Sequence, residues 1–374
     1  MGKLELKIFL LSSAESVHTV RWANALTERG IKVFLFTHTN VRDKLHSNVV
    51  VTLLKYRWSK NGVYFFNTKL LRRQIEQHCP DIIHAHFASG YGTLAANASV
   101  RYLLSVWGDD VYEFPRRSRL HKYLLTRTLN KADKIFSTSR VMAVETNKYV
   151  NRNIVVIPFG VDIPNFSIQK QPSNRIRLGI VKVMAEKYGV DVLLRAYHIL
   201  KNKYSNIEMS LDLYGDGPAL PSLRKIHEDM RKTLPYRADE VNFHGRIDNE
   251  MVPKVLTAID IFVIPSRSDG ESFGVAAVEA GASATACVVS EVGGLPEVVL
   301  DGKTGVVIQK DDPQALAAAL ERLILDKSFR DELGMNAREN VIEKYDWNVN
   351  VSQMIRMYRE HVQDEIDSGK SCSS

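Results

Sequence analysis

The chain has 374 residues, of which 45% are hydrophobic and 25% charged. This composition is that of a folded globular protein, and the length favours two domains, because one domain usually holds about 100–200 residues. The composition excludes a disordered, collagenous or disulfide-stapled chain. No apolar run approaches the ~20 residues that span a bilayer, and residues 1–11 are typical of a first strand and not of a signal peptide.

Charge is divided unevenly along the chain. Residues 1–168 carry 24 Lys and Arg against 12 Asp and Glu, a net charge of +12, whereas residues 169–374 carry 26 against 31, a net charge of −5. The basic half predicts an anionic partner, such as a membrane surface, a phosphorylated lipid or a nucleic acid. The cysteines lack the spacing of a metal site and indicate a reducing cytoplasm; they are Cys79, Cys287 and Cys372.

Short apolar runs alternate with helical patterns along the first half of the chain. Strands are predicted at residues 6–12, 32–37, 80–85, 102–106 and 134–139, and helices at 17–29 and 93–100. This alternation is typical of a parallel sheet covered by helices. Residues 154–164, which hold two prolines and a glycine, are predicted to form a linker.

The same alternation returns after the linker. Strands are predicted at 177–183, 208–214, 241–244, 260–265, 286–290 and 305–308, and helices at 190–201, 251–258, 275–282 and 313–325. The predicted fold class is α/β, with two doubly wound, Rossmann-like domains at 1–165 and 166–345. Residues 346–374 form a C-terminal helix that can pack back on the N-terminal domain, and a frayed polar tail. Because open parallel sheets bind ligands beyond the carboxyl ends of their strands, we expect a site in a cleft between the domains.

The segment richest in chemistry is SRSDGESFGVAAVE, residues 266–279. A polar loop here opens a helix near Gly274, and the amides at a helix start favour phosphate. Those amides belong to Phe273, Gly274 and Val275. The carboxylates of Glu271 and Glu279 repel phosphate and suit the hydroxyls of a sugar and a ribose. On its own, the E-x7-E spacing fits equally well a loop carboxylate and an exposed helix glutamate.

Two lysines and three glycine-bearing turns complete the pattern. Lys182 lies at the end of a predicted strand and Lys187 at the entry to the next helix, and their ammonium groups can clamp a diphosphate and neutralise a leaving group. Pairs of surface lysines are also common without such a role. The turns at 214–218, 244–247 and 293–297 each follow a strand, and ordinary turn chemistry explains any one of them.

In combination, these segments resemble a known family. From Ser12 to about Ile308 the chain is similar to the retaining glycosyltransferases of the GT-B fold, family 4. The order and spacing of the matching segments cover most of the chain and are specific together, although no single segment is. They are HTVRWANALTERGIKV, DIIHAH, ADKIFSTS, IPFGVD, YGDGP, ESFGVAAVEA and GGLPEVVLDGKTG.

The resemblance implies that the C-terminal domain binds a nucleotide sugar and the N-terminal domain binds the acceptor. It implies that Glu271 contacts hydroxyls of the transferred sugar and that Glu279 holds the ribose. Lys182, where the family more often has arginine, and Lys187 would bind the diphosphate. The other donor-binding positions that it implies are Gly215, Gly245, Arg246, Ile247, Ser272, Phe273, Gly274 and Val275.

The N-terminal domain departs from the family pattern. Its first loop, SSAESVHT, lacks the usual glycine pair, and His18 is expected to replace the contact that this pair makes with the diphosphate. Trp107 stands where the family usually has histidine, which alters the sugar pocket because an indole cannot accept a hydrogen bond. Asp109 or Asp110 is a candidate for orienting the acceptor hydroxyl.

The reaction implied is α-glycosyl transfer with retention, with a UDP-sugar favoured over GDP-mannose. The residues to which it assigns catalysis are Glu271, Lys187, Lys182, His18 and Asp109. Lysines and helix amides can support the leaving diphosphate without a metal. The acid pairs at 109–110 and 311–312 lack D-x-D spacing, so we predict no metal and no cofactor besides the donor.

A basic amphipathic segment follows Phe114 and Pro115. Its cations are Arg116, Arg117, Arg119, Lys122 and Arg127, and its apolar residues are Leu120, Tyr123, Leu124 and Leu129. The pattern predicts a helix on anionic lipid and equally describes a solvated helix face. A second group can grip a lipid or a sugar ring, although a place in the core is favoured; it comprises Tyr56, Trp58, Tyr64, Phe65 and Phe66.

The predicted acceptor is a lipid-linked oligosaccharide or polysaccharide of the cell surface, met at the cytoplasmic membrane face. One alternative is a non-catalytic protein that binds nucleotide sugars or polyanions. A dinucleotide-dependent oxidoreductase would need G-x-G-x-x-G after the first strand, and LLSSAESVHT does not supply it. No residue pattern indicates base readout, so a nucleic acid is not expected as a partner.

Overall fold

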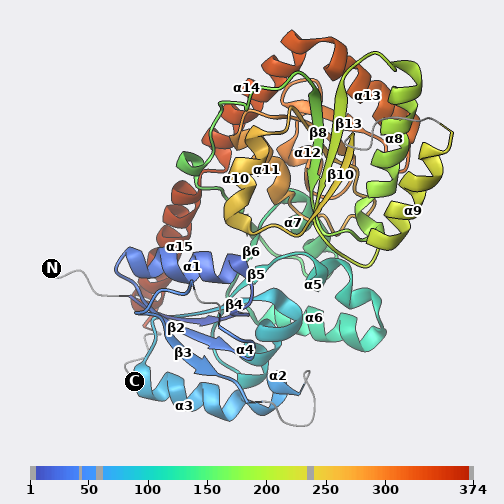
Figure 1. Cartoon of the computed structure of the whole chain (residues 1–374). Coiled ribbons are helices and arrows are strands. Elements are labelled where there is room, and N and C mark those ends of the chain that lie inside the picture. The colour runs from blue at the N-terminus through green and yellow to red at the C-terminus, as the bar shows by residue number, and fades with distance from the viewer. Residues whose placement is uncertain (1–5, 42–43, 56–61, 234–239, 370–374) are drawn as a thin grey trace. The chain divides into compact units, whose positions relative to one another are not determined.

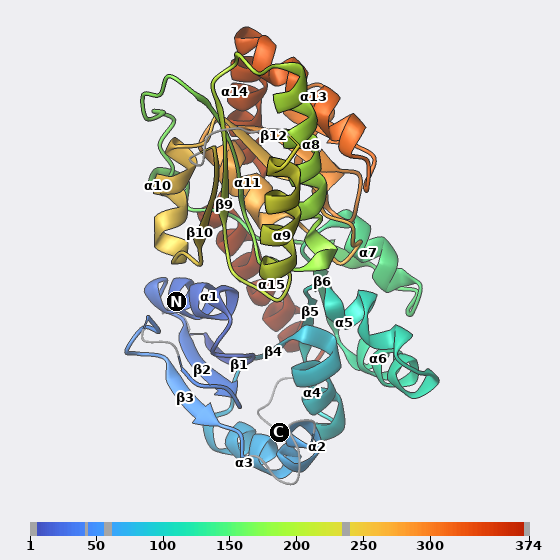
Figure 2. The same cartoon turned by 45° about the vertical axis from the view of Figure 1, so that its right-hand side comes forward.

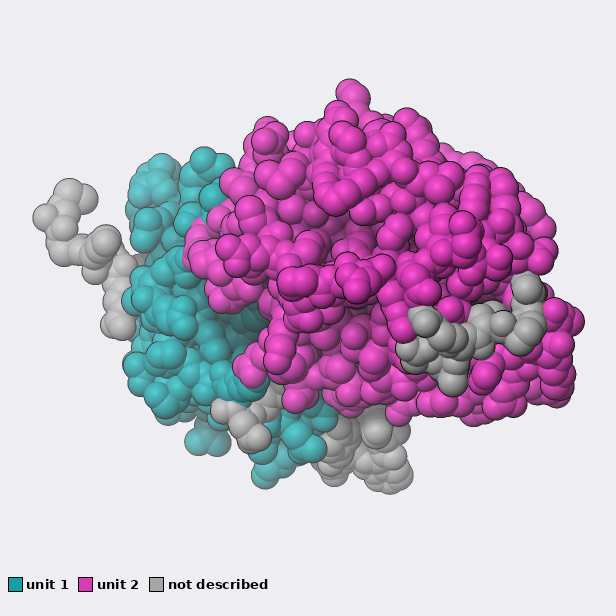
Figure 3. All heavy atoms as spheres, turned by 45° about the horizontal axis from the view of Figure 1, so that its top comes forward, with its two compact units in different colours: residues 1–158, 349–374 teal, residues 159–348 magenta. Residues whose placement is uncertain are grey.

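The computed structural model describes residues 6–41, 44–55, 62–233 and 240–369. The chain forms two compact units, coloured separately in Figure 3: unit 1 comprises Met1–Pro158 and Val349–Ser374, and unit 2 comprises Phe159–Asn348. Each unit has one parallel sheet, which confirms the predicted α/β class with two Rossmann-like folds. Tyr56, Trp58, Cys372 and the last residues of the predicted polar tail lie outside the described ranges.

Unit 1 contains a seven-stranded parallel sheet of order β3-β2-β1-β4-β5-β6-β7 (Figure 1). Its strands are β1 (Lys7–Leu11), β2 (Lys32–Thr37), β3 (Val50–Leu53), β4 (Ile82–His86), β5 (Leu103–Val106), β6 (Lys134–Ser137) and β7 (Ile154–Val156). Its helices are α1 (Val17–Glu28), α2 (Val63–Phe66), α3 (Thr68–His78), α4 (Gly92–Ala98), α5 (Asp109–Tyr112), α6 (Arg119–Lys131), α7 (Arg140–Asn147) and most of α15 (Trp347–Asp367). A π-helical turn, η1 (Phe87–Tyr91), and a 3₁₀ turn, η2 (Phe114–Arg116), precede α4 and α6.

Alternation along the strands places two different surfaces on the two faces of this sheet. Phe9 and Leu11 of β1, for example, face a core that also holds Leu94 of α4 and Leu125 of α6. The opposite face carries His84 of β4, whose ring reaches α15. Helix α15, the last helix of the chain, is therefore anchored in unit 1 through Tyr358.

The predicted linker at 154–164 is wrong at its start. Ile154–Val156 is strand β7, which pairs with β6 from Ile135↔Ile154 to Ser137↔Val156. The prolines and glycine that pointed to a linker all follow it. The apolar run at this edge strand, residues 154–157, is short and is followed directly by Pro158, so the sequence is typical of a connection as much as of a strand.

Unit 2 contains a six-stranded parallel sheet of order β10-β9-β8-β11-β12-β13. Its strands are β8 (Ile176–Val181), β9 (Met209–Tyr214), β10 (Val241–Gly245), β11 (Ile261–Ile264), β12 (Ala286–Ser290) and β13 (Gly305–Ile308). Its helices are α8 (Val190–Lys203), α9 (Leu220–Arg231), α10 (Val252–Thr257), α11 (Val275–Ala282), α12 (Leu295–Val298), α13 (Pro313–Leu325) and α14 (Lys327–Lys344). The 3₁₀ turns are η3 (Ile163–Asn165), η4 (Glu186–Tyr188) and η5 (Asn249–Met251). Helices α8 and α9 lie side by side in both views (Figures 1 and 2).

The strand order of unit 2 reverses between β8 and β11, which are neighbours. From β8 the chain moves through α8 toward β9, and from β11 it moves through α11 toward β12. The connections that follow β8 and β11 therefore run in opposite directions along the sheet. This is a topological switch point, the place where open α/β sheets bind ligands. The sheet of unit 1 has its own switch point between β1 and β4.

No helix among the described residues is both long and apolar enough to cross a membrane.

Candidate functional site

The switch point of unit 2 carries an ion pair between two predicted site residues. Lys182 follows β8, Glu271 lies in the loop after β11, and Lys182 Nζ is 2.8 Å from Glu271 Oε1 and 2.7 Å from Oε2. The side chains are 17% and 8% exposed, so the pair is shielded from water and holds both groups firmly. Ser266 Oγ donates a further hydrogen bond to Glu271 Oε2 at 3.3 Å.

An aromatic ring gathers the two predicted lysines. The ring of Tyr188, at the end of η4, lies 4.6 Å from Lys182 Nζ and 5.4 Å from Lys187 Nζ, measured to the ring centroid. Both distances are within the range of cation–π attraction. The structure thus brings Lys182, Lys187 and Glu271 together around Tyr188 and the Lys182–Glu271 ion pair.

Glycines let the neighbouring turns approach the backbone of these residues. A Cβ at Gly215, after β9, would lie 1.8 Å from the carbonyl oxygen of Lys182, and one at Gly293, after β12, would lie 2.2 Å from that of Glu271. Both have positive φ, which favours glycine. The glycine-bearing turns therefore pack against the loops that carry the ion pair.

Helix α11 begins beside Glu271, as expected from the sequence. Its N-cap is Gly274, with φ 89°, and the first amides of a helix have no partner within it. The side chain of Phe273 is buried and packs edge-on against Tyr345, with ring centroids 5.6 Å apart, so only its backbone can serve a ligand. Ser272, Val275 and Glu279 are half-buried near this helix start.

Two stacked rings lie at the ends of β9 and β10. The rings of Tyr214 and His244 are stacked, 4.2 Å apart with an interplanar angle of 7°, and His244 Nε2 is 2.7 Å from Asp212 Oδ1. The backbone of Gly245 accepts a hydrogen bond from the amide of Gly215 at 2.7 Å. This fixes the turn that continues into Arg246, which is exposed, and Ile247, which is half-buried.

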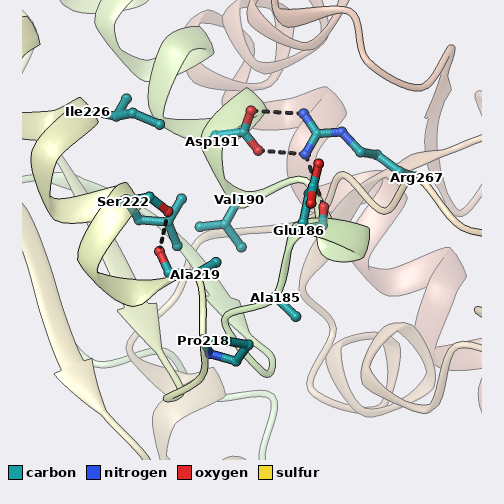
Figure 4. Close-up of a pocket in the computed structure, with 10 residues that line it drawn as sticks. Ala185, Glu186, Val190, Asp191, Pro218, Ala219, Ser222, Ile226 and Arg267 are labelled. Carbon is teal, nitrogen blue, oxygen red and sulfur yellow. Dashed lines mark hydrogen bonds and ion pairs between the residues drawn. The ribbon is translucent and has the colours of Figure 1, made fainter.

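A pocket of about 610 Å³ lies between the starts of α8 and α9 (Figure 4). It shares Ala185 and Glu186 with the loop that carries Lys187, but none of its lining residues is a predicted donor-binding residue. The lining comprises Ala185, Glu186, Val190, Asp191, Pro218, Ala219, Ser222, Leu223, Ile226 and Arg267. Its size is that of a small-molecule pocket, so it is a rival location for a nucleotide in unit 2.

In unit 1, three ring side chains meet near the sheet's switch point. Trp107, after β5, packs against His86 at the end of β4 with ring centroids 4.4 Å apart, and against His18 of α1 at 6.0 Å. Burial, aided by the charge of Arg21, lowers the pKa of His18 to about 4. His18 is therefore neutral at pH 7 and can bind a substrate as a hydrogen-bonding group but not as a cation.

The adjacent aspartates have different roles. Asp110 is buried, and its carboxylate accepts hydrogen bonds from the amides of Ala88, Trp107 and Gly108 at 2.7, 3.1 and 2.9 Å. Burial raises its pKa to about 6 against the lowering effect of these hydrogen bonds. Asp110 therefore fixes the Trp107 turn and is committed to it, whereas Asp109 is exposed.

A buried polar chain joins this region to α15. Both ring nitrogens of His84 form hydrogen bonds, Nδ1 with Tyr358 Oη at 2.7 Å and Nε2 with Ser105 Oγ at 2.9 Å. The ring of His84 also lies edge-on to that of His86, with centroids 4.6 Å apart. Burial lowers the pKa of His84 to about 3. Unit 1 thus holds neutral histidines that the unfolded chain would protonate in mild acid.

We expect His84→Gln to flatten the acid dependence of stability. Because the native pKa of His84 lies below its unfolded value, the stability it contributes is present above pH 6.5 and is lost as pH falls toward 3. The slope is about 1.4 kcal/mol per pH unit for each such histidine. Urea unfolding at pH 7, 6 and 5 measures it. Tyr358→Phe is the control: it removes a hydrogen bond worth about 1–2 kcal/mol at every pH and keeps the slope. An unchanged slope in His84→Gln would contradict the assignment.

One cluster in unit 1 has the ligand types of a metal site. Asp133, His361 and Glu365 each offer an atom within 4.8 Å of the others. Arg101 already contacts both carboxylates, at 3.2 Å to Asp133 and 2.9 Å to Glu365. With this internal cation, the cluster is suited to fastening the end of α15 to unit 1.

The sequence of the chain matches two family models, one in each half. Residues 163–340 match "Glycosyl transferases group 1" and residues 7–139 match "Glycosyl transferase 4-like". An uncharacterized glycosyltransferase of Methanocaldococcus jannaschii is 25% identical over 338 residues, 89% of this chain and 91% of the relative. A glycosyltransferase assigned to teichuronic acid biosynthesis in Bacillus subtilis is 27% identical, over 75% and 70% of the two chains. A phosphatidyl-myo-inositol mannosyltransferase of Mycolicibacterium smegmatis is 29% identical over 54% and 51%.

Solved structures share the whole fold. Sucrose-phosphate synthase of Thermosynechococcus elongatus has a TM-score of 0.81 at 21% identity, covering 96% of this chain and 100% of its own. HepE of Anabaena in complex with UDP-glucose has a TM-score of 0.76 at 18% identity, covering 95% and 100%. The fold is therefore that of the GT-B glycosyltransferases. The chain belongs to the group 1, family 4-like glycosyltransferases, as its sequence motifs predict.

Sequence reasoning missed several residues that build the site. Tyr188, Ser266, Arg267 and Asp191 all contact the loops that carry Lys187 and Glu271. An aromatic residue directly after Lys187 was the available signal for Tyr188. Asp191 and Arg267 are far apart in sequence, and no local pattern pairs them.

Proposed function

We propose that this glycosyltransferase transfers a sugar, with retention, from a nucleoside diphosphate sugar to a hydroxyl of a lipid-linked or polysaccharide acceptor, forming an α-linkage. The favoured donor is a UDP-sugar. The observation that carries the proposal is the joint placement of Lys182, Lys187 and Glu271 at the switch point, next to the start of α11. The HepE complex with UDP-glucose and the relative that is a phosphatidyl-myo-inositol mannosyltransferase support the donor and acceptor classes.

The proposed chemistry uses charge rather than a protein nucleophile. Two ammonium groups and the amides of α11 stabilise the diphosphate as the bond to the sugar breaks. The carboxylate of Glu271 is held by Lys182 and Ser266, which orients it to accept hydrogen bonds from sugar hydroxyls. This arrangement supplies the positive charge that a divalent metal supplies elsewhere, and we propose that no metal takes part.

The test of the proposed function is donor binding and turnover. UDP and UDP-sugars are expected to raise the melting temperature more than GDP and GDP-mannose do. Slow hydrolysis of the preferred donor should release the α-anomer first, as read by ¹H NMR. Binding of a donor without any hydrolysis or transfer would favour the alternative, a non-catalytic nucleotide-sugar-binding protein.

We propose further that unit 1 meets its acceptor at the cytoplasmic face of an anionic membrane. Leu120 and Tyr123 of α6 are each 63% exposed. The exposed cations around them are Arg116, Arg117, Arg119 and Lys122. This surface, the α6 patch, combines apolar anchors with charges that attract anionic lipid.

The structure corrects the predicted amphipathic segment. Leu129 is fully buried, and Arg127 donates to Asn97 Oδ1 at 2.8 Å, so neither belongs to the patch. The preference for core in the second group is wrong for Phe65 and Phe66, which are 48% and 54% exposed. Tyr64 is half-buried, with its ring edge-on to His38 at 5.3 Å.

Replacing Leu120 and Tyr123 together by glutamate is expected to weaken binding to vesicles of phosphatidylcholine and phosphatidylglycerol by about 10-fold or more, because apolar burial is lost and charge repulsion added. Co-sedimentation at low salt measures this. Ile366→Glu is the matched control, since Ile366 is 52% exposed on α15 among acidic residues. Equal binding by the double variant and the wild type would remove α6 from the proposed membrane contact.

A further inference from the structure

We infer that Arg267 is a positioning residue for the donor site, and that it acts by holding the turn that carries Lys187. It follows β11 and precedes Glu271 by only a few residues. The inference rests on the proposed function, because it takes Lys187 to bind the diphosphate.

The main chain and the side chain of Arg267 both grip this turn. The amide of Arg267 donates to the carbonyl of Lys187 at 2.9 Å, and its Nη1 donates to the carbonyl of Glu186 at 3.0 Å. The two carbonyls that flank the Lys187 side chain on the backbone are thus fixed by one residue. A lysine on such a turn is pre-positioned for a ligand, which lowers the entropy lost on binding.

The guanidinium is itself fixed by a bidentate ion pair. Nη1 and Nη2 donate to the two carboxylate oxygens of Asp191, in the first turn of α8, at 2.7 and 2.8 Å. Figure 4 shows the two groups facing each other. Burial raises the pKa of Asp191, but the hydrogen bonds and charge of Arg267 outweigh it and the net shift is downward. Asp311, after β13, accepts a further bond from Nε.

The residues on either side of Arg267 serve Glu271 instead. Ser266 Oγ donates to the Glu271 carboxylate, and the carbonyl of Ser268 accepts the Glu271 amide at 3.0 Å. Three consecutive residues therefore reach both halves of the site. Ser266 holds the Glu271 carboxylate and Ser268 holds the Glu271 backbone, whereas Arg267 holds the turn that carries the Lys187 ammonium group. This couples the loops after β8 and β11 on the carboxyl side of the sheet.

A second ion pair provides a matched control. Arg177 Nη2 lies 3.0 Å from Asp260 Oδ1, and this pair joins β8 to the start of β11 at the opposite end of the strands. Its side chains are 12% and 18% exposed, against 24% and 25% for Arg267 and Asp191. Loss of the control pair costs stability without releasing the Lys187 turn.

Amide hydrogen exchange tests the structural part without any ligand. In Arg267→Met, and in the milder Asp191→Asn, we expect exchange in residues 185–193 to accelerate about 10-fold or more, because local opening becomes easier. Arg177→Met should leave the exchange of this segment unchanged. Unaltered exchange in both site variants would overturn the inference, whether or not the protein binds a nucleotide.

A double-variant cycle on UDP affinity tests the functional part. In the wild-type background, Arg267→Met is expected to weaken UDP binding about 10-fold. In the Lys187→Met background it should cause no further loss, because Arg267 acts on the nucleotide through Lys187. Arg177→Met should be additive with Lys187→Met. Full additivity of Arg267→Met would overturn the inference. A wild-type protein that binds no UDP would instead contradict the proposed function, and the exchange result would still stand.

Discussion

Glu271→Gln is expected to lower kcat/KM for sugar transfer by about 10²–10³-fold, the loss typical when a group that stabilises the transition state is removed. Glutamine keeps the size of the side chain and an oxygen that can accept from Ser266 or Lys182. It loses the charge that makes Glu271 a strong acceptor for sugar hydroxyls. UDP affinity should hold or rise, because Lys182 then has no carboxylate to neutralise it.

Steady-state kinetics with the preferred donor, together with UDP titration, separates these two effects. Glu321→Gln is the matched control: Glu321 pairs with Lys203 at 2.8 Å, away from the switch point. We expect a melting temperature near that of the wild type in both variants. Transfer at the wild-type rate by Glu271→Gln would remove Glu271 from the catalytic residues, and a collapsed fold would make its role structural.

Lys187→Met is expected to weaken UDP binding by about 10–100-fold, since a hydrogen bond to a charged group contributes about 1.5–3 kcal/mol. The physical reason is the loss of an ammonium group from a turn that is already fixed, so that nothing else can take its place without rearrangement. Isothermal titration with UDP and with uridine distinguishes a diphosphate contact from a nucleoside contact. The variant should lose affinity for UDP but keep the wild-type affinity for uridine.

Lys203→Met controls for the change of net charge. Lys203 lies in the last turn of α8, in the same unit, and is paired with Glu321. The Lys203→Met variant should bind UDP as the wild type does, apart from the small effect of long-range charge. If Lys187→Met and Lys203→Met bind UDP equally well, Lys187 does not contact the diphosphate.

The sequence predicted the elements of unit 2 where local signals agree. Helix α11, strands β12 and β13 and helix α13 have the predicted bounds. A glycine precedes α11, and Asp312 caps α13 by accepting from the amide of Ala315 at 2.8 Å. Such residues fix boundaries through backbone chemistry that acts over one turn.

Strand β3, Val50–Leu53, was not predicted, although it lies in the apolar run VVVTLL at residues 49–54, which is typical of a strand. It forms the edge of the sheet, and none of its side chains is fully buried. The predicted lipid-facing group on α6 was too broad. Leu129 lies on the face that packs into the core, and its neighbours in the pattern do not reveal which face that is.

The sequence names candidate residues for the site, but it does not predict the contacts between them. Lys182 and Glu271 were singled out separately, for a diphosphate and for sugar hydroxyls. Their ion pair depends on β8 and β11 being neighbours, which the strand order decides and the local sequence does not. The pairing of Arg267 with Asp191 depends on the same adjacency.

A crystal structure of the protein with UDP tests most directly whether the nucleotide diphosphate sits at the switch point of unit 2. Our expectation is that phosphate oxygens lie within hydrogen-bond distance of Lys187 Nζ and of the first amides of α11, after Gly274. A nucleotide seated instead between α8 and α9, against Ser222 and Ile226 in the pocket of Figure 4, would contradict it.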